Sequence, residues 1–144
     1  MPGGRTRGGS AIRLTNGRYL RLVAVLELDE CTGDQLRLQA MTWQYQNTAH
    51  DDSWVFRADY SRARIATASP PRGHFHIDGA LRQPGVLGPK QALGRVYFPC
   101  RQPTLEAAVV LLADEFRVPT NAPQEVWRAA VAEHEARSAR LFDR

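Results

Sequence analysis

The chain has 144 residues and a formal net charge of +4 at pH 7, and 43% of its residues are hydrophobic while 24% are charged. A globular chain of this size buries a core without disulfides or a structural metal, and its two cysteines form no CxxC unit that would indicate a disulfide framework. No apolar run approaches the length of a membrane span, and the Gly- and Arg-rich residues 1–10 lack the apolar core of a signal peptide. We therefore expect a cytoplasmic protein that does not bind a membrane.

Arginine supplies almost all of the positive charge, because Lys90 is the only lysine in the chain. The guanidinium fork matches phosphates and carboxylates bidentately and stacks on bases. A GC-rich coding sequence would produce the same bias, so the basic composition permits contact with nucleic acid without requiring it.

Residues 1–17 are expected to form a flexible arm that ends in the turn signal Asn16-Gly17. Beyond it, apolar and polar residues alternate with period two, which predicts strands at 18–29 and 35–47. A short turn separates these two strands, and we expect them to form an antiparallel hairpin.

The same alternation predicts a third strand at 54–62, a fourth at 73–79 and a short fifth at 95–99. Helical spacing of apolar residues then predicts helices at 104–118, with Thr104 as N-cap, and at 124–142. The predicted fold class is α+β: a mostly antiparallel five-stranded sheet at 18–99, followed by two C-terminal helices packed on one face, in a single domain at 18–144.

The fourth predicted strand has the most chemically distinctive pattern of the chain. Alternate residues of a strand point to opposite faces, so His74, His76 and Asp78 share one face while Phe75 and Ile77 share the other. Histidine is a common acid, base or metal ligand near neutral pH. These three polar side chains could ligate a divalent ion, but the sequence offers no obvious fourth ligand, and we expect neither a metal nor a cofactor.

Which sheet face the helices cover is not determined by the pattern. If they cover the faces that bear Phe75, Phe56 and Trp54, the opposite face collects arginines, imidazoles and aromatic side chains. Its expected members are Trp43, Tyr45, Arg57, Asp59, His74, His76, Arg95 and Tyr97.

Such a set could bind a phosphodiester and move a proton at it. We expect His74 or His76 as general base or acid, Arg57 as phosphate clamp and Tyr45 as a positioning group. Substrate contacts are expected from Asp59, Trp43, Arg95 and Tyr97, because aromatic rings can stack on bases. RNA cleavage through the 2′-OH needs no metal. The alternative is a solvated sheet face on which Arg57 pairs with Asp59 and the aromatic residues pack against the second helix.

Three short motifs occur in order: Trp43-Gln44-Tyr45-Gln46, then Trp54-Val55-Phe56-Arg57-Ala58-Asp59-Tyr60, then His74-Phe75-His76. Over about residues 18–80 this arrangement resembles the small bacterial toxins of the TumE type, which have an aromatic strand, an FRYDN-like strand and a histidine cluster. The resemblance implies a toxin of a toxin–antitoxin pair that acts on RNA or translation. The family's recurrent polar residues match Arg57, Asp59, His74 and His76.

Two main functions fit these patterns, and a metal-dependent enzyme is a third possibility. The first is a toxin with metal-independent ribonuclease activity, which an antitoxin-like protein partner would neutralise. The second is a non-enzymatic subunit that binds nucleic acid or protein. In both, a partner or a second copy could dock on the last helix around Trp127, Val131 and Leu141, because amphipathic helices are common docking elements.

Overall fold

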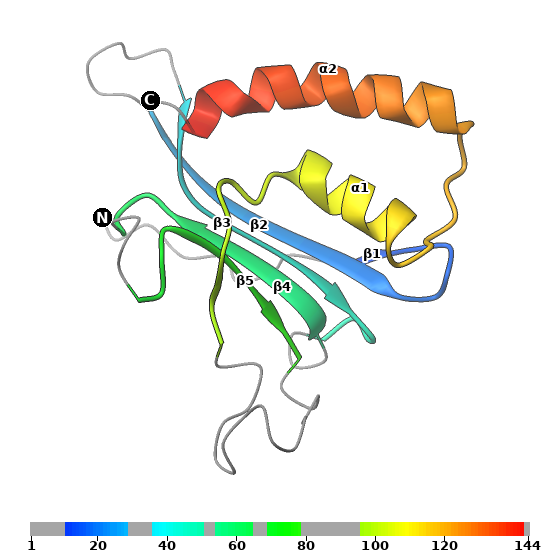
Figure 1. The fold of residues 1–144 in the computed structure, drawn as a ribbon, viewed down its shortest axis with the longest axis horizontal. Helices are drawn as coiled ribbons and strands as arrows, with labels where there is room; N and C mark the ends of the chain where they lie inside the picture. Colours follow the sequence, from blue (N-terminus) through cyan, green and yellow to red (C-terminus); the bar gives the residue numbers. More distant parts are fainter. Residues whose placement is uncertain (1–10, 29–35, 51–53, 65–68, 79–95, 143–144) are drawn as a thin grey trace, which may run out of the picture.

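The computed structural model describes residues 11–28, 36–50, 54–64, 69–78 and 96–142, except for the side chains of residues 140 and 141. Its elements follow in chain order: β1 (Ile12–Arg13), β2 (Tyr19–Leu28), β3 (Leu36–Gln46), β4 (Trp54–Ser61), β5 (Gly73–Ile77), β6 (Phe98–Pro99), α1 (Leu105–Asp114) and α2 (Gln124–Phe142). The strands precede the helices, and both helices lie on the same side of the sheet (Figure 1).

The sheet is a meander in which each strand pairs antiparallel with its neighbour in sequence, in the order β1-β2-β3-β4-β5-β6. The predicted α+β class, with an antiparallel sheet followed by two C-terminal helices, is confirmed. The predicted hairpin is β2 with β3. The sheet has six strands because Ile12–Arg13, inside the expected N-terminal arm, pair with the start of β2. The Asn16-Gly17 turn joins them, with Gly17 at φ 78°, a conformation that glycine adopts without steric cost.

Two β-bulges change which face some residues occupy. In the β3–β4 pair, Tyr45 lies opposite Phe56 but Gln46 lies opposite Trp54, so Val55 is the extra residue. Trp54 therefore turns to the face opposite Phe56, and its predicted place beside Phe56 is wrong. In the β2–β3 pair the extra residue is Gln39 on β3, since Val25 pairs with Ala40 and Leu26 with Leu38.

The helices cover the face on which Trp43, Tyr45, Phe56 and Phe75 lie. Trp43 stacks on Phe56, Phe56 on Phe75 and Phe75 on Phe98, with ring centroids 5.3, 5.2 and 5.1 Å apart. The Trp43 indole Nε1 donates to the backbone oxygen of Pro103, which leads into α1, at 3.0 Å. The predicted place of Trp43 and Tyr45 on the uncovered face is therefore wrong: they pair with Ala58 and Phe56, which puts them in the core.

Helix α1 begins as predicted, because the Thr104 side chain accepts a hydrogen bond from the Ala107 amide at 3.1 Å. It ends at Asp114, four residues before the predicted end, and Arg117 adopts a positive φ of 53°. This early end lets Phe116 turn into the core, where its ring lies 4.9 Å from Tyr45.

Helix α2 has the predicted bounds but is mostly exposed. Phe142 anchors its end against Tyr60, with ring centroids 5.0 Å apart, and Arg128 pairs with Asp114 of α1 at 2.6 Å. Trp127 and Val131 are half-buried, while the side chain of Leu141 lies outside the described residues. Neither of the described helices combines the length and apolar character needed to cross a membrane.

Candidate active site

Strands β4 and β5 bring four of the predicted site residues together on the face that the helices leave uncovered, called here the polar face. Asp59 lies directly opposite His74, and Arg57 lies opposite His76. Directly paired residues of an antiparallel ladder share a face, so the four side chains form a compact square. The antiparallel register thus assembles the site from two short segments that are far apart in sequence.

Asp59 is the member of this square that the other three side chains approach. Its Oδ1 accepts a hydrogen bond from Thr42 Oγ1 at 2.6 Å and from Arg57 Nη2 at 2.9 Å, and its Oδ2 accepts from Arg57 Nε at 2.9 Å. The His76 Nε2 lies 3.4 Å from the same Oδ2, and the His74 Nε2 lies 4.0 Å from it. One carboxylate thus orients a guanidinium and faces both imidazoles.

The two imidazoles are chemically different. His74 Nδ1 lies 2.8 Å from the backbone oxygen of Pro71, and a carbonyl oxygen can only accept a hydrogen bond. In its neutral form, His74 therefore carries its proton on Nδ1, and its Nε2 lone pair faces Asp59. The shorter distance from His76 Nε2 to Asp59 suits a proton on that nitrogen. His74 can thus accept a proton at Nε2, and His76 can donate one from Nε2. The centroids of the two rings are 4.9 Å apart.

Tyr97 and Trp54 border the histidines. The Tyr97 ring packs edge-on against His74 and His76, with centroids 5.2 and 5.0 Å away, and Tyr97 itself is exposed. Trp54, which the Val55 bulge turns to this face, contacts His76 edge-on at 6.1 Å. Tyr97 lies beside the histidines as predicted, whereas Arg95 lies outside the described residues.

The polar face extends across β3 to β2 through residues that were not predicted to belong to the site. Arg21, Gln44, Arg57 and His76 form a row of directly paired residues over four strands. At about 4.8 Å per strand, the two arginines of the row originate roughly 10 Å apart. A signal for Gln44 was present in the sequence, because it belongs to the aromatic motif at 43–46. Its position opposite Arg57, however, could be known only from the register of β3 with β4.

Much of the polar face is buried. Gln44 Nε2 donates to Gln46 Oε1, and Gln46 Nε2 donates to the Thr48 backbone oxygen, both at 2.8 Å. Only 5% of Gln44, none of Gln46 and 5% of His74 is exposed. Of the alternative predicted from the sequence, the pairing of Arg57 with Asp59 is confirmed. Trp43 and Tyr45 are packed, but against Pro103 and Phe116 on either side of α1 and not against the second helix, and this part of the face is not solvated.

Strand β5 is held against the following chain at Gly73. A Cβ atom at this position would lie 2.6 Å from the backbone oxygen of Cys100, which is too close for any side chain. Burial raises the pKa of Cys100 to about 11, and the negative charge of Asp59 adds to the rise. A neutral thiol is a poor nucleophile, so the imidazoles are the better candidates for chemistry here.

The same residues could hold a divalent cation. One ligand atom each from Asp59, His74 and His76 lie within 4.8 Å of one another. Asp59 takes the place that was predicted for Asp78. The contact of His74 with a carbonyl is typical of metal-binding histidines. Arg57 argues against a metal, because its guanidinium already pairs with the Asp59 carboxylate that the cation would need.

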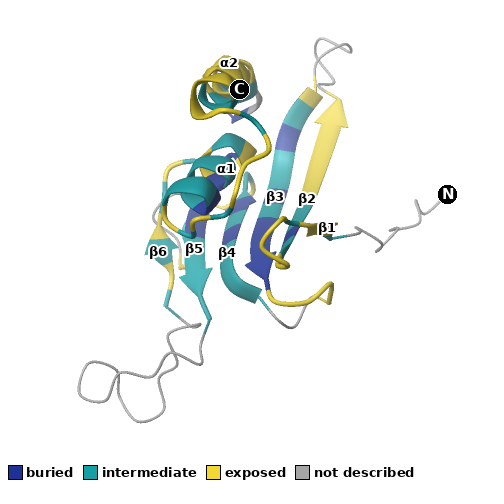
Figure 2. Cartoon of the chain, turned by 90° about the vertical axis from the view of Figure 1, so that its right-hand side faces the viewer, coloured by how far each residue is buried: buried dark blue, intermediate teal, exposed yellow. Residues whose placement is uncertain are grey.

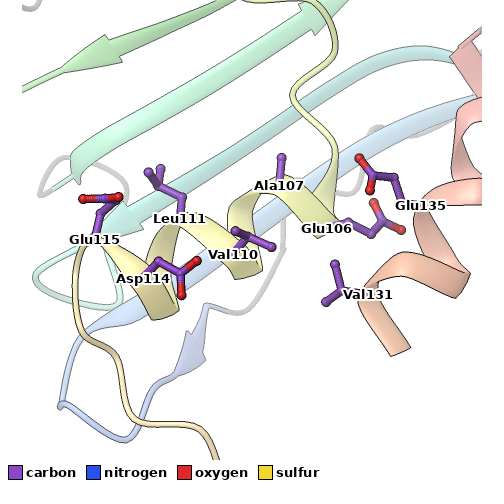
Figure 3. A pocket seen from close by; sticks show the side chains of 8 residues that line it. All are labelled: Glu106, Ala107, Val110, Leu111, Asp114, Glu115, Val131 and Glu135. Atoms are coloured by element: carbon purple, nitrogen blue, oxygen red, sulfur yellow. The ribbon is translucent and has the colours of Figure 1, made fainter. Parts of the chain in front are cut away.

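Two pockets lined by described residues include neither histidine in their lining. One, of about 460 Å³, lies between α1 and α2 (Figure 3). Its lining has four acidic side chains and the apolar residues Ala107, Val110, Leu111 and Val131. The other, of about 350 Å³, lies between Tyr60, Gly73, Cys100 and Phe142. Tyr97 and Trp54 border the site on the sheet, and neither of these two pockets is lined by His74 or His76.

Comparison of the chain with protein-family models, curated proteins and solved structures found no match.

Proposed function

We propose that the polar face cleaves RNA by metal-independent acid–base catalysis, and that the chain is the toxin of a toxin–antitoxin-like pair. The observation that carries the activity is the convergence of His74 Nε2 and His76 Nε2 on Asp59 Oδ2, at 4.0 and 3.4 Å, beside the Arg57 guanidinium. The toxin class rests on the resemblance of the three sequence motifs to TumE-type proteins.

His74 suits the role of general base. Its Nε2 accepts the proton of a ribose 2′-OH while the Pro71 carbonyl holds Nδ1. The 2′-oxygen then attacks the adjacent phosphorus, a 2′-O–P bond forms, and the bond from phosphorus to the 5′-oxygen breaks. The products are a 2′,3′-cyclic phosphate and a free 5′-hydroxyl.

His76 suits the role of general acid, because its Nε2 lies 3.4 Å from Asp59 Oδ2, where a proton on that nitrogen faces the carboxylate. It delivers a proton to the departing 5′-oxygen. Arg57 donates its Nε proton and one Nη2 proton to Asp59. Three N–H groups of the guanidinium therefore remain for the phosphate oxygens. Its side chain is 41% exposed, so RNA would reach the site from the Arg57 side.

The test is cleavage of an RNA oligonucleotide by the purified chain. We expect His74→Ala and His76→Ala each to lower the rate by about 10²- to 10⁴-fold, as for other general acids and bases. His134→Ala, which alters an exposed histidine on α2, is the matched control and should leave the rate unchanged. Tyr45→Phe should also leave it unchanged, because Tyr45 lies in the core and its hydroxyl accepts from Asn16.

A substrate with 2′-deoxyribose at the cleaved position should resist cleavage, since it lacks the nucleophile. Equal cleavage by the wild type and by the His74→Ala/His76→Ala double variant, both folded, would refute the activity. In cells, expression of the wild type should slow growth and degrade RNA, and the double variant should do neither.

A divalent metal is the competing interpretation, because Asp59, His74 and His76 have a suitable arrangement. Elemental analysis of the purified chain and chelation by EDTA separate the two. We expect no stoichiometric metal and no loss of cleavage after chelation. A bound transition metal that is lost in the His74→Ala variant, together with cleavage that requires its return, would assign the site to metal chemistry.

The pocket between α1 and α2 supports the proposed protein partner (Figure 3). Its apolar floor and its acidic residues Glu106, Glu115 and Glu135 suit a partner helix with apolar and basic side chains. Val131 lies on α2, the helix for which the sequence predicts docking. Co-expression with the product of a neighbouring small reading frame should relieve the growth defect, and Val131→Asp should prevent that relief while leaving RNA cleavage intact.

A further inference from the structure

Among the residues that the structure describes, the outer edge of β2 has no strand partner beyond Leu20. Within the described residues, β1 pairs only with Tyr19 and Leu20, and no other strand pairs with this edge from Arg21 to Leu28. Figure 2 shows this part of β2 as exposed, at the margin of the sheet. An open edge presents unpaired backbone N–H and C=O groups to any strand that approaches it.

The side chains of this segment are apolar on both faces of the sheet. Val23 and Val25 on the polar face are 43% and 49% exposed, and Leu26 on the helix-covered face is 45% exposed. Natural edge strands usually carry lysine, proline or inward-facing charges that prevent pairing. Residues 22–26 contain none of these, so this segment has none of the usual protection against pairing with another strand.

The segment is also self-complementary. Arg21-Leu22-Val23-Ala24-Val25-Leu26-Glu27 has the same apolar residues when read from either end, with opposite charges at the two ends. Two copies paired antiparallel about Ala24 place Arg21 opposite Glu27, Leu22 opposite Leu26 and Val23 opposite Val25. The bulge residue Gln39 belongs to β3, so the side chains of β2 alternate without interruption through this segment.

Only this centre pairs the charges. In an antiparallel pair, residues opposite each other share a face, so the two-fold axis must pass through a residue. An axis at Val23 would place Arg21 opposite Val25, and an axis at Val25 would place Glu27 opposite Val23. Opposite charges across a ladder stabilise it, and a charge opposite an apolar side chain does not.

We propose that the chain forms a homodimer by antiparallel pairing of β2 with β2 of a second copy, centred on Ala24. The two six-stranded sheets would then continue into one. A two-fold axis perpendicular to the sheet keeps both polar faces on the same side, so both histidine sites would face one surface. This interface uses an edge distinct from α2 and does not depend on the proposed activity.

The first test is the molar mass of the full chain by sedimentation velocity and light scattering. We expect twice the monomer mass for the wild type, and the monomer mass for Val25→Lys. Val126→Lys alters a valine on α2 that is 54% exposed, against 49% for Val25, and should remain dimeric. A monomeric wild type, or a Val25→Lys variant that is folded and still dimeric, would overturn the proposal.

A charge exchange tests the register. Arg21→Glu faces Glu27 of an identical copy, and Glu27→Arg faces Arg21, so each variant alone should be mainly monomeric. When the two variants are mixed, both contacts become complementary, and the mixture should recover the dimer mass. Circular dichroism of each variant confirms that it is folded. A mixture of two folded variants that stays monomeric would overturn the pairing.

A cysteine at the centre provides a second register test that does not depend on charge. In a background with Cys31→Ser and Cys100→Ser, Ala24→Cys should form an intermolecular disulfide under mild oxidation, because each copy places residue 24 opposite itself. Val23→Cys faces Val25 and should crosslink far less, as should Ala136→Cys on exposed α2. Equal crosslinking at the three positions would refute a centre at Ala24.

Discussion

The two faces of the sheet at β3, β4 and β5 are built from alternate residues of the same strands, yet they are stabilised differently. On the helix-covered face, Trp43, Phe56 and Phe75 stack in an aromatic ladder. On the polar face, Thr42, Asp59 and His74 lie on the same three strands, and hydrogen bonds satisfy them. Both faces are largely buried, so burial does not separate structure from function here.

What separates the faces is the free-energy cost of their burial. Apolar rings gain free energy when water is removed, whereas a buried carboxylate or imidazole must recover its lost hydration through specific partners. Asp59 recovers it through Thr42 and Arg57. We infer that substitutions on the helix-covered face mainly change stability, and that substitutions on the polar face change activity more than stability.

The largest expected effect on stability comes from the centre of the aromatic ladder. Trp43→Ala should lower the free energy of unfolding by about 3–5 kcal/mol, because it leaves a large cavity and removes the contact with Pro103. Trp54→Ala removes the same side chain type from the polar face, where Trp54 is only half-buried, and should cost clearly less. Urea unfolding of both variants checks this, and equal losses would mean that the two faces do not differ as described.

A moderate effect is expected at Asp59. Asp59→Asn keeps the size of the side chain but removes the charge that holds the Arg57 fork, and it should lower the free energy of unfolding by about 1–2 kcal/mol. Solvent screens the exposed part of Arg57, which limits the loss. RNA cleavage should fall at least as far as in Arg57→Ala. A variant with wild-type stability and wild-type cleavage would show that the carboxylate holds neither partner.

The smallest effect concerns Cys100, whose pKa is raised to about 11 by burial and then by the charge of Asp59. In a Cys31→Ser background, alkylation by iodoacetamide should be about 100-fold slower near pH 8 than for a free thiol of pKa 9.0, since only the thiolate reacts. The rate should rise tenfold per pH unit until the pH approaches 11. Asp59→Asn should increase the rate modestly, because burial remains the main cause.

The same shift has a consequence for stability. The folded state holds the thiol proton more tightly than the unfolded state, so the unfolded chain releases it first as the pH rises. The free energy of unfolding should therefore decrease between about pH 9 and pH 11, and this part of the decrease should vanish in Cys100→Ser. A thiol that reacts at the rate of a free cysteine would instead show that Cys100 is not buried as described.

Local patterns in the sequence were sufficient for several features of this protein. Thr104 caps α1, α2 spans the predicted residues, and β2 and β3 form the predicted hairpin, because capping and period-two alternation depend on neighbouring residues. The shared face of His74 and His76 follows from the same alternation. Their chemistry was recognisable from residue type alone.

Only the tertiary structure decided which polar residues meet and which aromatic residues are buried. The extra residue Val55 turns Trp54 to the polar face, and the β3–β4 register places Trp43 and Tyr45 under the helices. The β4–β5 register brings Asp59, and not Asp78, into the set of converging ligand atoms with the two histidines. A shift of one residue in pairing reverses every side chain of a strand, and such shifts depend on contacts between segments that are distant in sequence.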